Sequence, residues 1–421
     1  MATIRTLLTI AVNRNWDTIQ LDVSNAFLHG DISEDLYMQQ PQGFIDINNP
    51  KLVCKLNKSL YGLKQAPRNW FEKFTGFLQN YGFRSSHSDS SLFLYNFNNI
   101  QIFLLLYVDD ILVTGNNTAA IQTLISALHS QFTLKNLGPT SLFLGIQVIR
   151  QATGLFLTQQ HYAEKLLNES GLLDSKQTST PTTPKSNAQT MQNQPFEDPP
   201  LYRRLAGLLQ YLSITRPDIA FAINQACQHM HQPTVQDFQS LKRLLRYIKG
   251  TASFGIPITK GLMILRTYSD ADWASDTSDR KSISGFCTFL GPNLISWSVK
   301  KQVTVAKSST EAEYRSLSAA TSDVIWLRRL VAELDHPQHS PTIIHCDNTS
   351  AIALAKNPVF HARTKHIEID HHFIRQHINS GAISVTHIAS ADQLADLLTK
   401  HLSPARFHDL RRKLTIQKLD A

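Results

Sequence analysis

The chain has 421 residues, of which 42% are apolar and 18% charged, and its formal net charge is +8. This composition excludes global disorder, a collagen repeat and a disulfide scaffold, and the length predicts two or three domains. The longest apolar run, Ile102–Val108, is far shorter than the ~20 residues that cross a bilayer, so we expect no membrane segment. Four widely spaced cysteines without a CxxC pair indicate buried thiols in a reducing, intracellular compartment.

Adjacent carboxylates mark the first 175 residues, whose pattern is mixed α/β. The apolar run predicts a buried strand, and Ile111–Thr114 predicts a short return strand. Asp109 and Asp110 therefore lie at a hairpin tip, where they repel each other unless a cation binds them. Asp22 ends another strand-like run, and three carboxylates on neighbouring strand ends could hold two Mg²⁺ ions. Because strand side chains alternate, we expect Asp109 to be the direct ligand and Asp110 an accessory. Two aspartates alone are more often an ordinary solvated turn.

A connector and a basic helical block follow. Residues 176–200 contain five prolines and no Leu, Ile or Val, so this segment cannot bury a core of its own. In the block at 201–260, Pro217 suits a first helical turn, and a helix is expected from Thr234 as N-cap to Gly250. Eight basic and two acidic residues in this block form a surface that would attract a phosphate backbone, although a solvated helix face is equally typical. The cations assigned to this surface are Arg203, Arg204, Lys242, Arg243, Arg246 and Lys249.

A compact α/β domain is predicted at 261–402, and a short basic tail at 403–421. Short β-rich runs predict an antiparallel meander, and a long helix follows from Ser309. The meander strands are expected at Leu262–Tyr268, Ile283–Leu290, Leu294–Trp297 and Gln302–Val305. Two further strands, Thr342–Cys346 and Ile383–Ile388, each lead into a helix, at Thr349–Ala355 and Ala391–Lys400.

The long helix offers two acids, and helical geometry separates them. Glu313 lies four residues before Leu317 and falls on the apolar stripe, whereas Glu311 points to the opposite side. Glu311 also follows Ser308 at the spacing of a capping box. We therefore expect Glu311 to cap the helix and Glu313 to be a metal ligand, because an acid on an inward stripe is costly unless it is paired.

Three other acids complete this second group. Asp270 ends the first strand of the domain, Asp347 follows the strand at 342–346, and Asp396 lies in the last predicted helix. Asp392, one turn earlier, is a weaker candidate. Four convergent acids suit cleavage of a phosphodiester by water with two metal ions.

The histidines of FHARTKHIEIDHHFIRQH do not predict a metal centre. They are His361, His366, His371, His372 and His377. No cysteine lies at zinc-finger spacing from them, so we expect polar surface and no zinc site.

Several longer stretches resemble a known family. QLDVSNAFLHGDISEDLYMQQPQGF, SLYGLKQAPRNWF, LLLYVDDILVTG and FLGIQV are similar to the reverse transcriptase of copia-type LTR retrotransposons. YSDADWAS, SSTEAEYRSL, CDNTSAIALAKNP and ADQLADLLTKHL are similar to the ribonuclease H of such elements. The resemblance covers Ile4 to about Leu402 in the family's order. It implies an α/β (α+β) fold with a reverse transcriptase palm at 1–175, a linker at 176–200, a helical thumb or connection at 201–260 and a ribonuclease H-like domain at 261–402.

The resemblance also implies residue roles. Asp22, Asp109 and Asp110 match the polymerase metal ligands, and Asp270, Glu313, Asp347 and Asp396 those of the nuclease, with two Mg²⁺ or Mn²⁺ ions per site. Phe27 matches an aromatic that selects deoxynucleotides. Gly62, Lys64 and Pro67 match a segment lining the nucleotide and template pocket, and Phe143, Leu144 and Gly145 match a loop that grips the primer end.

The implied function is RNA-directed DNA polymerase with ribonuclease H activity. Its partners would be an RNA template, a DNA primer, an RNA–DNA hybrid and deoxynucleoside triphosphates, with integrase and protease segments in the parent polyprotein. The location would be a cytoplasmic particle or the nucleus. Because family members carry a basic fingers region ahead of this start, we expect weak primer extension and retained hybrid cleavage. The alternative is a nonenzymatic remnant that keeps the fold and binds nucleic acid.

Overall fold

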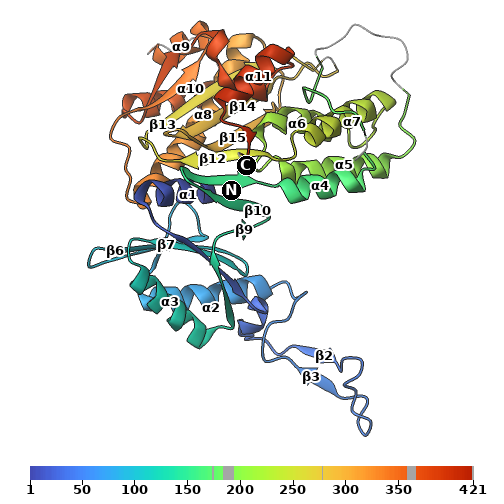
Figure 1. Cartoon of the computed structure of the whole chain (residues 1–421), viewed down its shortest axis with the longest axis vertical. Helices are drawn as coiled ribbons and strands as arrows, with labels where there is room; N and C mark the ends of the chain where they lie inside the picture. Colours follow the sequence, from blue (N-terminus) through green and yellow to red (C-terminus); the bar gives the residue numbers. More distant parts are fainter. Residues whose placement is uncertain (173–174, 184–193, 277, 358–366, 420–421) are drawn as a thin grey trace. The chain divides into compact units, whose positions relative to one another are not determined.

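The computed structural model describes residues 1–172, 175–183, 194–276, 278–357 and 367–419 (Figure 1). The chain divides into two compact units. One unit is Arg14–Leu144, here called the hairpin unit, and the other is Met1–Asn13 with Gly145–Ala421, here called the large unit. Both contain helices and sheets, which confirms the mixed α/β class. Within the described ranges, no helix has both the length and the apolarity that a membrane crossing needs.

The hairpin unit is built on one antiparallel sheet with strand order β4-β5-β6-β7-β1-β8. Its strands are β1 (Thr18–Val23), β4 (Arg84–Ser85), β5 (Leu92–Phe97), β6 (Ile100–Tyr107), β7 (Asp110–Gly115) and β8 (Leu134–Pro139). Helices α2 (Ala66–Tyr81) and α3 (Thr118–Gln131) cover one face of it, and Trp70, Phe74 and Leu124 are buried between these layers (Figure 1). The predicted hairpin of β6 and β7 is confirmed. The unit also holds η1 (Ala26–His29), β9 (Leu142–Phe143) and a small hairpin of β2 (Tyr37–Gln39) and β3 (Val53–Lys55).

A helical block and a sheet form the first part of the large unit, which also contains α1 (Ala2–Arg14). The sheet runs β18-β12-β11-β10, from β10 (Ile146–Gln151), β11 (Gly154–Thr158), β12 (Phe254–Thr259) and β18 (Gln417–Lys418). The helices are α4 (Gln160–Glu169), α5 (Pro199–Leu212), η2 (Pro217–Ile219), α6 (Ala220–Gln228) and α7 (Val235–Gly250). Thr234 caps α7 in a capping box with Asp237, and the helix ends at Gly250, as predicted.

The second part of the large unit is a five-stranded sheet with order β15-β14-β13-β16-β17. Its strands are β13 (Leu265–Asp272), β14 (Ile283–Leu290), β15 (Asn293–Lys301), β16 (Thr342–Cys346) and β17 (Ile383–His387). The first three are antiparallel, whereas β16 pairs in parallel with both β13 and β17. The accompanying helices are α8 (Ser309–Glu333), α9 (Thr349–Lys356) and α10 (Glu368–Asn379). The long helix, the later strands and three of the four predicted meander strands are therefore confirmed, while α10 was not predicted.

Two predicted elements are wrong. Residues Gln302–Val305 form no strand, because the Gln302 amide donates to Ser282 O at the sheet edge and its side chain turns inward to Ala312 O. In place of one helix at Ala391–Lys400 there are two short 3₁₀ helices, η4 (Ser390–Asp392) and η5 (Leu394–Leu398). Gln393 lies between them in extended conformation, where its side chain donates to Ser269 O and accepts from Ala395 N. Tertiary hydrogen bonds thus outweigh the helical pattern.

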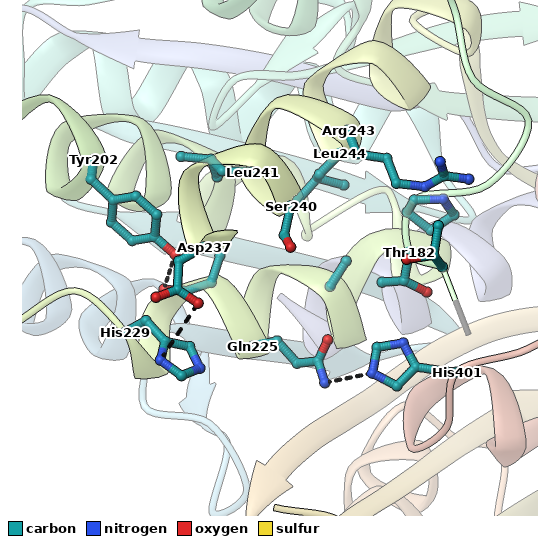
Figure 2. A pocket seen from close by; sticks show the side chains of 14 residues that line it. Thr182, Tyr202, Gln225, His229, Asp237, Ser240, Leu241, Arg243, Leu244 and His401 are labelled. Atoms are coloured by element: carbon teal, nitrogen blue, oxygen red, sulfur yellow. Dashed lines mark hydrogen bonds and ion pairs between the residues drawn. The ribbon is translucent and has the colours of Figure 1, made fainter. Parts of the chain in front are cut away.

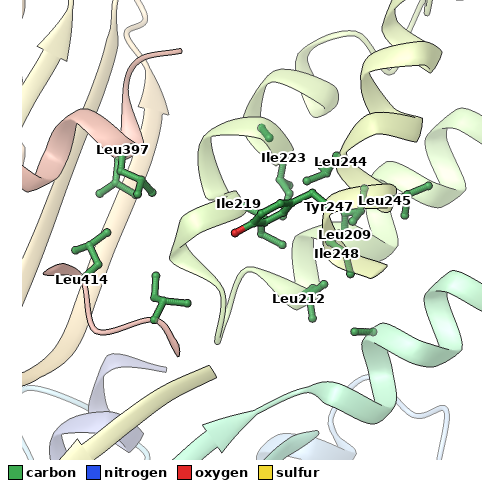
Figure 3. Packing of buried hydrophobic residues seen from close by; sticks show 14 of the residues in the cluster. Leu209, Leu212, Ile219, Ile223, Leu244, Leu245, Tyr247, Ile248, Leu397 and Leu414 are labelled. Carbon is green, nitrogen blue, oxygen red and sulfur yellow. The ribbon is translucent and has the colours of Figure 1, made fainter. Parts of the chain in front are cut away.

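The C-terminal residues are packed rather than trailing. Where a basic tail was expected at 403–421, the chain forms α11 (Pro404–Lys413) and then β18. Phe407, Leu410 and Leu414 repeat at helical spacing and are buried in the same cluster as the block at 201–260. Figure 3 shows Leu397 and Leu414 on the side of this core opposite α6 and α7. The basic residues of this segment led to the prediction of a tail, although the apolar residues among them repeat at helical spacing.

Candidate active sites

The first group of acids lies where β1 and β7 pair. The antiparallel register places Asp22 directly opposite Asp110, so both side chains face the same side of the sheet. The backbone carbonyl of Asp109 accepts a hydrogen bond from Val23 N at 2.9 Å, and this bond fixes the backbone of Asp109 at the turn. Burial, then the charges of Asp109 and Asp22, raise the pKa of the Asp110 carboxyl above its usual value, and a hydrogen bond from Gln20 opposes the rise. The structure therefore places the three predicted acids near one another, although they are not among the groups of described residues whose potential ligand atoms lie within 4.8 Å of one another. The assignment of Asp109 as direct ligand stays a prediction.

The turn that carries these acids is strained. Val108 has φ +58°, a conformation that β-branched residues rarely adopt. The Trp70 indole donates to Val108 O at 2.6 Å, and its ring packs against Phe74 and Phe132. Trp70 therefore fixes the carbonyl of the strained residue from α2. No local pattern in the sequence indicates this role of Trp70, because the contact joins residues 38 positions apart.

A pocket of about 360 Å³ lies beside this turn. The predicted Phe27 and Pro67 line it together with Tyr107 and Val108, the two residues just before Asp109. The Phe27 ring packs on Tyr61 with centroids 4.7 Å apart. Phe27, Tyr107 and Pro67 give this pocket an apolar wall that could hold a flat ring, and none of the three acids is among its lining residues.

Other predicted nucleotide and primer residues lie outside the lining of this pocket. Gly62 has φ +97° in the loop before α2, and Lys64 in that loop is exposed. Phe143 is buried on β9, and Leu144 follows it with φ +48°. Gly145, in the large unit, has φ +70°, and a Cβ there would clash with the Tyr211 hydroxyl.

The second group of acids converges from four separate elements. Asp270 is near the end of β13, Glu313 is in α8, Asp347 follows β16 and Asp396 is in η5. Carboxylate oxygens of Asp270, Asp347 and Asp396 lie within 4.8 Å of one another, and so do ligand atoms of Glu313, Cys346 and Asp347. Parallel pairing of β13 with β16 explains the meeting, because equivalent ends of parallel strands lie at one sheet edge. All four predicted acids are therefore neighbours.

Burial sets the electrostatics of this cluster. Burial, then the charges of Asp270 and Asp347, raise the pKa of Glu313 to about 9. Burial also raises the pKa of Asp270 to about 6, although the ammonium of Lys400 opposes the rise. Buried carboxylates that repel one another are the donor set that a divalent oxygen-seeking cation favours. These residues therefore fit Mg²⁺ or Mn²⁺.

Basic residues that the sequence analysis missed contact the acids. Lys400 Nζ lies 2.9 Å from Asp270 Oδ1 and 2.8 Å from Asp396 Oδ1. Arg406 reaches Asp396 Oδ2 at 3.3 Å, and the Thr399 hydroxyl donates to Asp270 Oδ2. The spacing of Asp396 and Lys400, four residues apart, was the only signal in the sequence.

Comparison with known proteins identifies the family. Residues 1–184 match the family model described as reverse transcriptase (RNA-dependent DNA polymerase). The chain is 45% identical, over 99% of its length, to the retrovirus-related Pol polyprotein from transposon RE1 of Arabidopsis thaliana, of which it covers 28%. It is 38% identical, over 97% of its length, to the Pol polyprotein from transposon TNT 1-94 of Nicotiana tabacum, of which it covers 31%. The chain belongs to the copia-type retrotransposon Pol family. It spans less than a third of the length of these relatives.

Solved structures give weaker likenesses. The N-terminal RNase H domain of a Mycobacterium tuberculosis protein is 11% identical with a TM-score of 0.25, covering 36% of this chain and 97% of that one. A foamy viral protease–reverse transcriptase in complex with double-stranded DNA is 11% identical with a TM-score of 0.23, covering 92% of this chain and 60% of that one.

The two weaker acidic candidates of this Pol-family chain have other partners. Glu311 accepts from Lys307 N at 2.8 Å and from Arg315 at 2.6 Å, and its own amide donates to the Ser308 hydroxyl. Ser308 is therefore the N-cap of α8, and only half of the predicted capping box forms, because the Glu311 carboxylate accepts from Lys307 N and not from Ser308 N. Asp392 forms an ion pair with Lys413 at 2.9 Å.

The predicted basic surface is divided between two environments. Arg203 and Arg204 are exposed on α5, with Arg204 3.6 Å from Glu169. On α7, Lys249 donates to Ser175 O, Arg246 to Lys176 O and Arg243 to the Thr180 hydroxyl. Lys242 lies over the ring of Phe238. Three of the six cations therefore hold the start of the predicted linker against α7. Residues 184–193 of that linker lie outside the described residues.

A cavity of about 170 Å³ opens between α6, α7 and the chain at 181–183 (Figure 2). Asp237 is 3.7 Å from His229, and Gln225 is 3.0 Å from His401 across the cavity wall. Its polar side chains thus pair largely with one another.

Among the histidines, His361 and His366 lie outside the described residues. His371 is buried on α10 and stacks on Tyr314 with centroids 6.3 Å apart, whereas His372 is exposed.

Proposed function

We propose that this chain is an RNA-directed DNA polymerase with ribonuclease H activity, acting by metal-assisted phosphoryl transfer in both halves. The observation that carries the proposal is the close approach of Asp270, Glu313, Asp347 and Asp396 from distant parts of the chain. An arrangement that costs desolvation and repulsion in the metal-free protein is expected where a cation is to be bound.

In the nuclease half, the four acids would hold two Mg²⁺ or Mn²⁺ ions. When bound, such ions activate a water and neutralise charge on the scissile phosphate. The residues of the chain itself provide the frame. Ser390 donates to Asp347 Oδ2 at 3.0 Å, and Thr399 orients Asp270, so both carboxylates are held in place before a ligand arrives. In the metal-free protein the raised pKa keeps Glu313 protonated at neutral pH.

In the polymerase half, Asp22, Asp109 and Asp110 would be the metal ligands. Phe27 and Pro67 line the pocket beside the hairpin turn, which supports a role for them in holding the deoxynucleoside triphosphate. Gly62, Lys64, Phe143, Leu144 and Gly145 stay proposals from the family resemblance.

An RNA template, a DNA primer and their hybrid are the proposed partners, together with integrase and protease segments of a parent polyprotein. Exposed Arg203 and Arg204 are better placed for a phosphate backbone than Arg243, Arg246 and Lys249, which already bond to the chain at 175–180. The intracellular location stays a prediction.

The deciding experiment assays the chain on two labelled substrates with Mg²⁺. One is an RNA–DNA hybrid for cleavage, and the other a primed RNA template for extension. Glu313→Gln should abolish cleavage only, and Asp109→Asn extension only. Binding of the hybrid by folded protein without cleavage would contradict the nuclease assignment and favour the nonenzymatic alternative.

A further inference from the structure

Lys400 occupies an unusual position in the carboxylate cluster. Its ammonium lies between Asp270 Oδ1 and Asp396 Oδ1, at 2.9 and 2.8 Å, and its side chain is only one-third exposed. Asp270, Asp396 and Asp347 also form one of the two groups whose oxygens lie close enough to share a metal ion. A lysine of this chain therefore already neutralises two of the three acids at one potential cation position.

Among the described residues, no ion pair neutralises the other side of the cluster in this way. Glu313 and Asp347, with Cys346, form the second group of potential ligand atoms. Glu313 is buried, and the Lys400 ammonium pairs with Asp270 and Asp396 instead. Asp347 accepts a hydrogen bond from the Ser390 hydroxyl, a neutral donor. The two groups of potential ligand atoms thus differ in the positive charge placed beside them.

We propose that Lys400 is a built-in competitor for one of the two metal positions of the nuclease site. The inference rests on the proposed function, which it deepens. One divalent cation binds at Glu313 and Asp347 without disturbing the lysine. A second cation at Asp270, Asp347 and Asp396 has to displace the ammonium, because Lys400 Nζ already occupies one oxygen of Asp270 and one of Asp396 and would repel a divalent ion bound beside it.

Competition of this kind gives the two metal ions unequal affinities. The lysine stabilises the metal-free cluster by holding Asp270 and Asp396 together, and the same contacts have to be broken before the second ion binds. Arg406, on the far oxygen of Asp396, stays in place and keeps this carboxylate oriented. Lys400 is therefore a positioning and selectivity residue, and it sets the metal concentration at which the site is filled.

Direct counting of bound Mn²⁺ tests the proposal. Electron paramagnetic resonance of free Mn²⁺ would be recorded while the full chain is titrated, for wild type and for Lys400→Met. Lys413→Met is the matched control, since Lys413 pairs with Asp392 and Asp409 on the surface. We expect one tight and one weak ion in wild type and in the control. In Lys400→Met, the weak ion should bind about tenfold more tightly, a usual size for coupling between two ligands. An unchanged second affinity in folded Lys400→Met would overturn the proposal.

A second measurement needs no variant and covers the case in which Lys400→Met does not fold. Amine acetylation of the wild-type protein, read by mass spectrometry, should modify Lys400 slowly without metal and faster once Mn²⁺ fills both positions. Lys413 should react equally in both conditions. Slower modification of Lys400 with metal, or no change, would contradict displacement.

Both measurements are independent of catalysis. Hybrid cleavage can fail while Mn²⁺ still binds in two steps that depend on Lys400, which would refute the proposed activity and leave the competition intact. Conversely, cleavage with two equal Mn²⁺ affinities in wild type would refute the competition and keep the activity.

Discussion

The two acidic sites of this chain solve the same electrostatic problem differently. Asp22, Asp109 and Asp110 are half-buried at the end of a hairpin, and the groups acting on Asp110 are two carboxylates and the Gln20 amide. In the nuclease cluster, Asp270 and Glu313 are buried, and Lys400 and Arg406 reach in as internal cations. Water can screen the first group, whereas the second needs charges from the protein itself. Exposure thus decides whether a site needs its own counter-ions.

The largest expected effect is the separation of the two activities. Asp347→Asn should reduce hybrid cleavage by about 10³-fold and leave primer extension within about twofold, and Asp22→Asn should do the reverse, since each removes a charge that stabilises one transition state. Steady-state rates on the two labelled substrates measure both. If either variant lost both activities while still folded, the two sites would not be independent.

Substituting a core residue of α11 should lower the stability of the large unit, which carries the second group of acids. Leu410 is fully buried in the cluster that contains α7 and η5, so Leu410→Ala should cost about 2–5 kcal/mol in the free energy of unfolding. Cleavage should then be lost at lower urea concentration than in wild type. Arg412→Ala, at a side chain that is 80% exposed, is the control and should change stability by less than about 0.5 kcal/mol. If Leu410→Ala lowered the free energy of unfolding no more than Arg412→Ala, the packing of α11 would not contribute to the stability of this core.

The pH dependence of the unfolding free energy of the metal-free protein should test the difference in burial between the two groups of acids. Between its usual pKa and about 9, Glu313 holds a proton in the folded protein that the unfolded chain has released, so stability falls as pH rises through this range. The slope from this group is at most about 1.4 kcal/mol per pH unit. Glu313→Gln should flatten the curve in urea unfolding with a chelator present. Asp110→Asn should change the slope of stability against pH much less, because Asp110 is half-exposed. A larger effect of Asp110→Asn than of Glu313→Gln would contradict the difference in burial.

The smallest expected effect concerns the strained hairpin turn. Val108 has φ +58° and is 46% exposed, so Val108→Gly relieves strain with little loss of burial. We expect a gain of up to about 1 kcal/mol in thermal unfolding. Val113→Gly, in a regular buried part of the same hairpin, should destabilise instead. A destabilised Val108→Gly would mean that the valine side chain holds the turn.

Local patterns were enough to predict the hairpin. The strand at 100–107, its return and the two aspartates between them are adjacent in sequence, and only Asp22 had to come from elsewhere. The choice of Glu313 over Glu311 also followed from helical periodicity, and the structure supplies Glu311 with its cap partners. By contrast, nothing local signalled Trp70 on Val108, since an indole and a carbonyl show no pattern until the chain is folded.

Two of the failed predictions share one cause. The helix expected at Ala391–Lys400 is broken because Gln393 bonds to Ser269, and the expected tail folds because three apolar side chains find a core. In both places a partner more than a hundred residues away along the chain, or a surface made by other elements, outweighed local preference.

By itself the amino-acid order determined which side chains carry negative charge, where strands and the long helix begin, and to which family the chain belongs. Folding alone decided that Lys400, Arg406 and Thr399 meet the second group of acids, and that the Trp70 indole holds the turn at Val108. The physical reason is range: periodicity and capping act over a few residues, whereas desolvation and ion pairing depend on which distant groups are brought within a few ångströms.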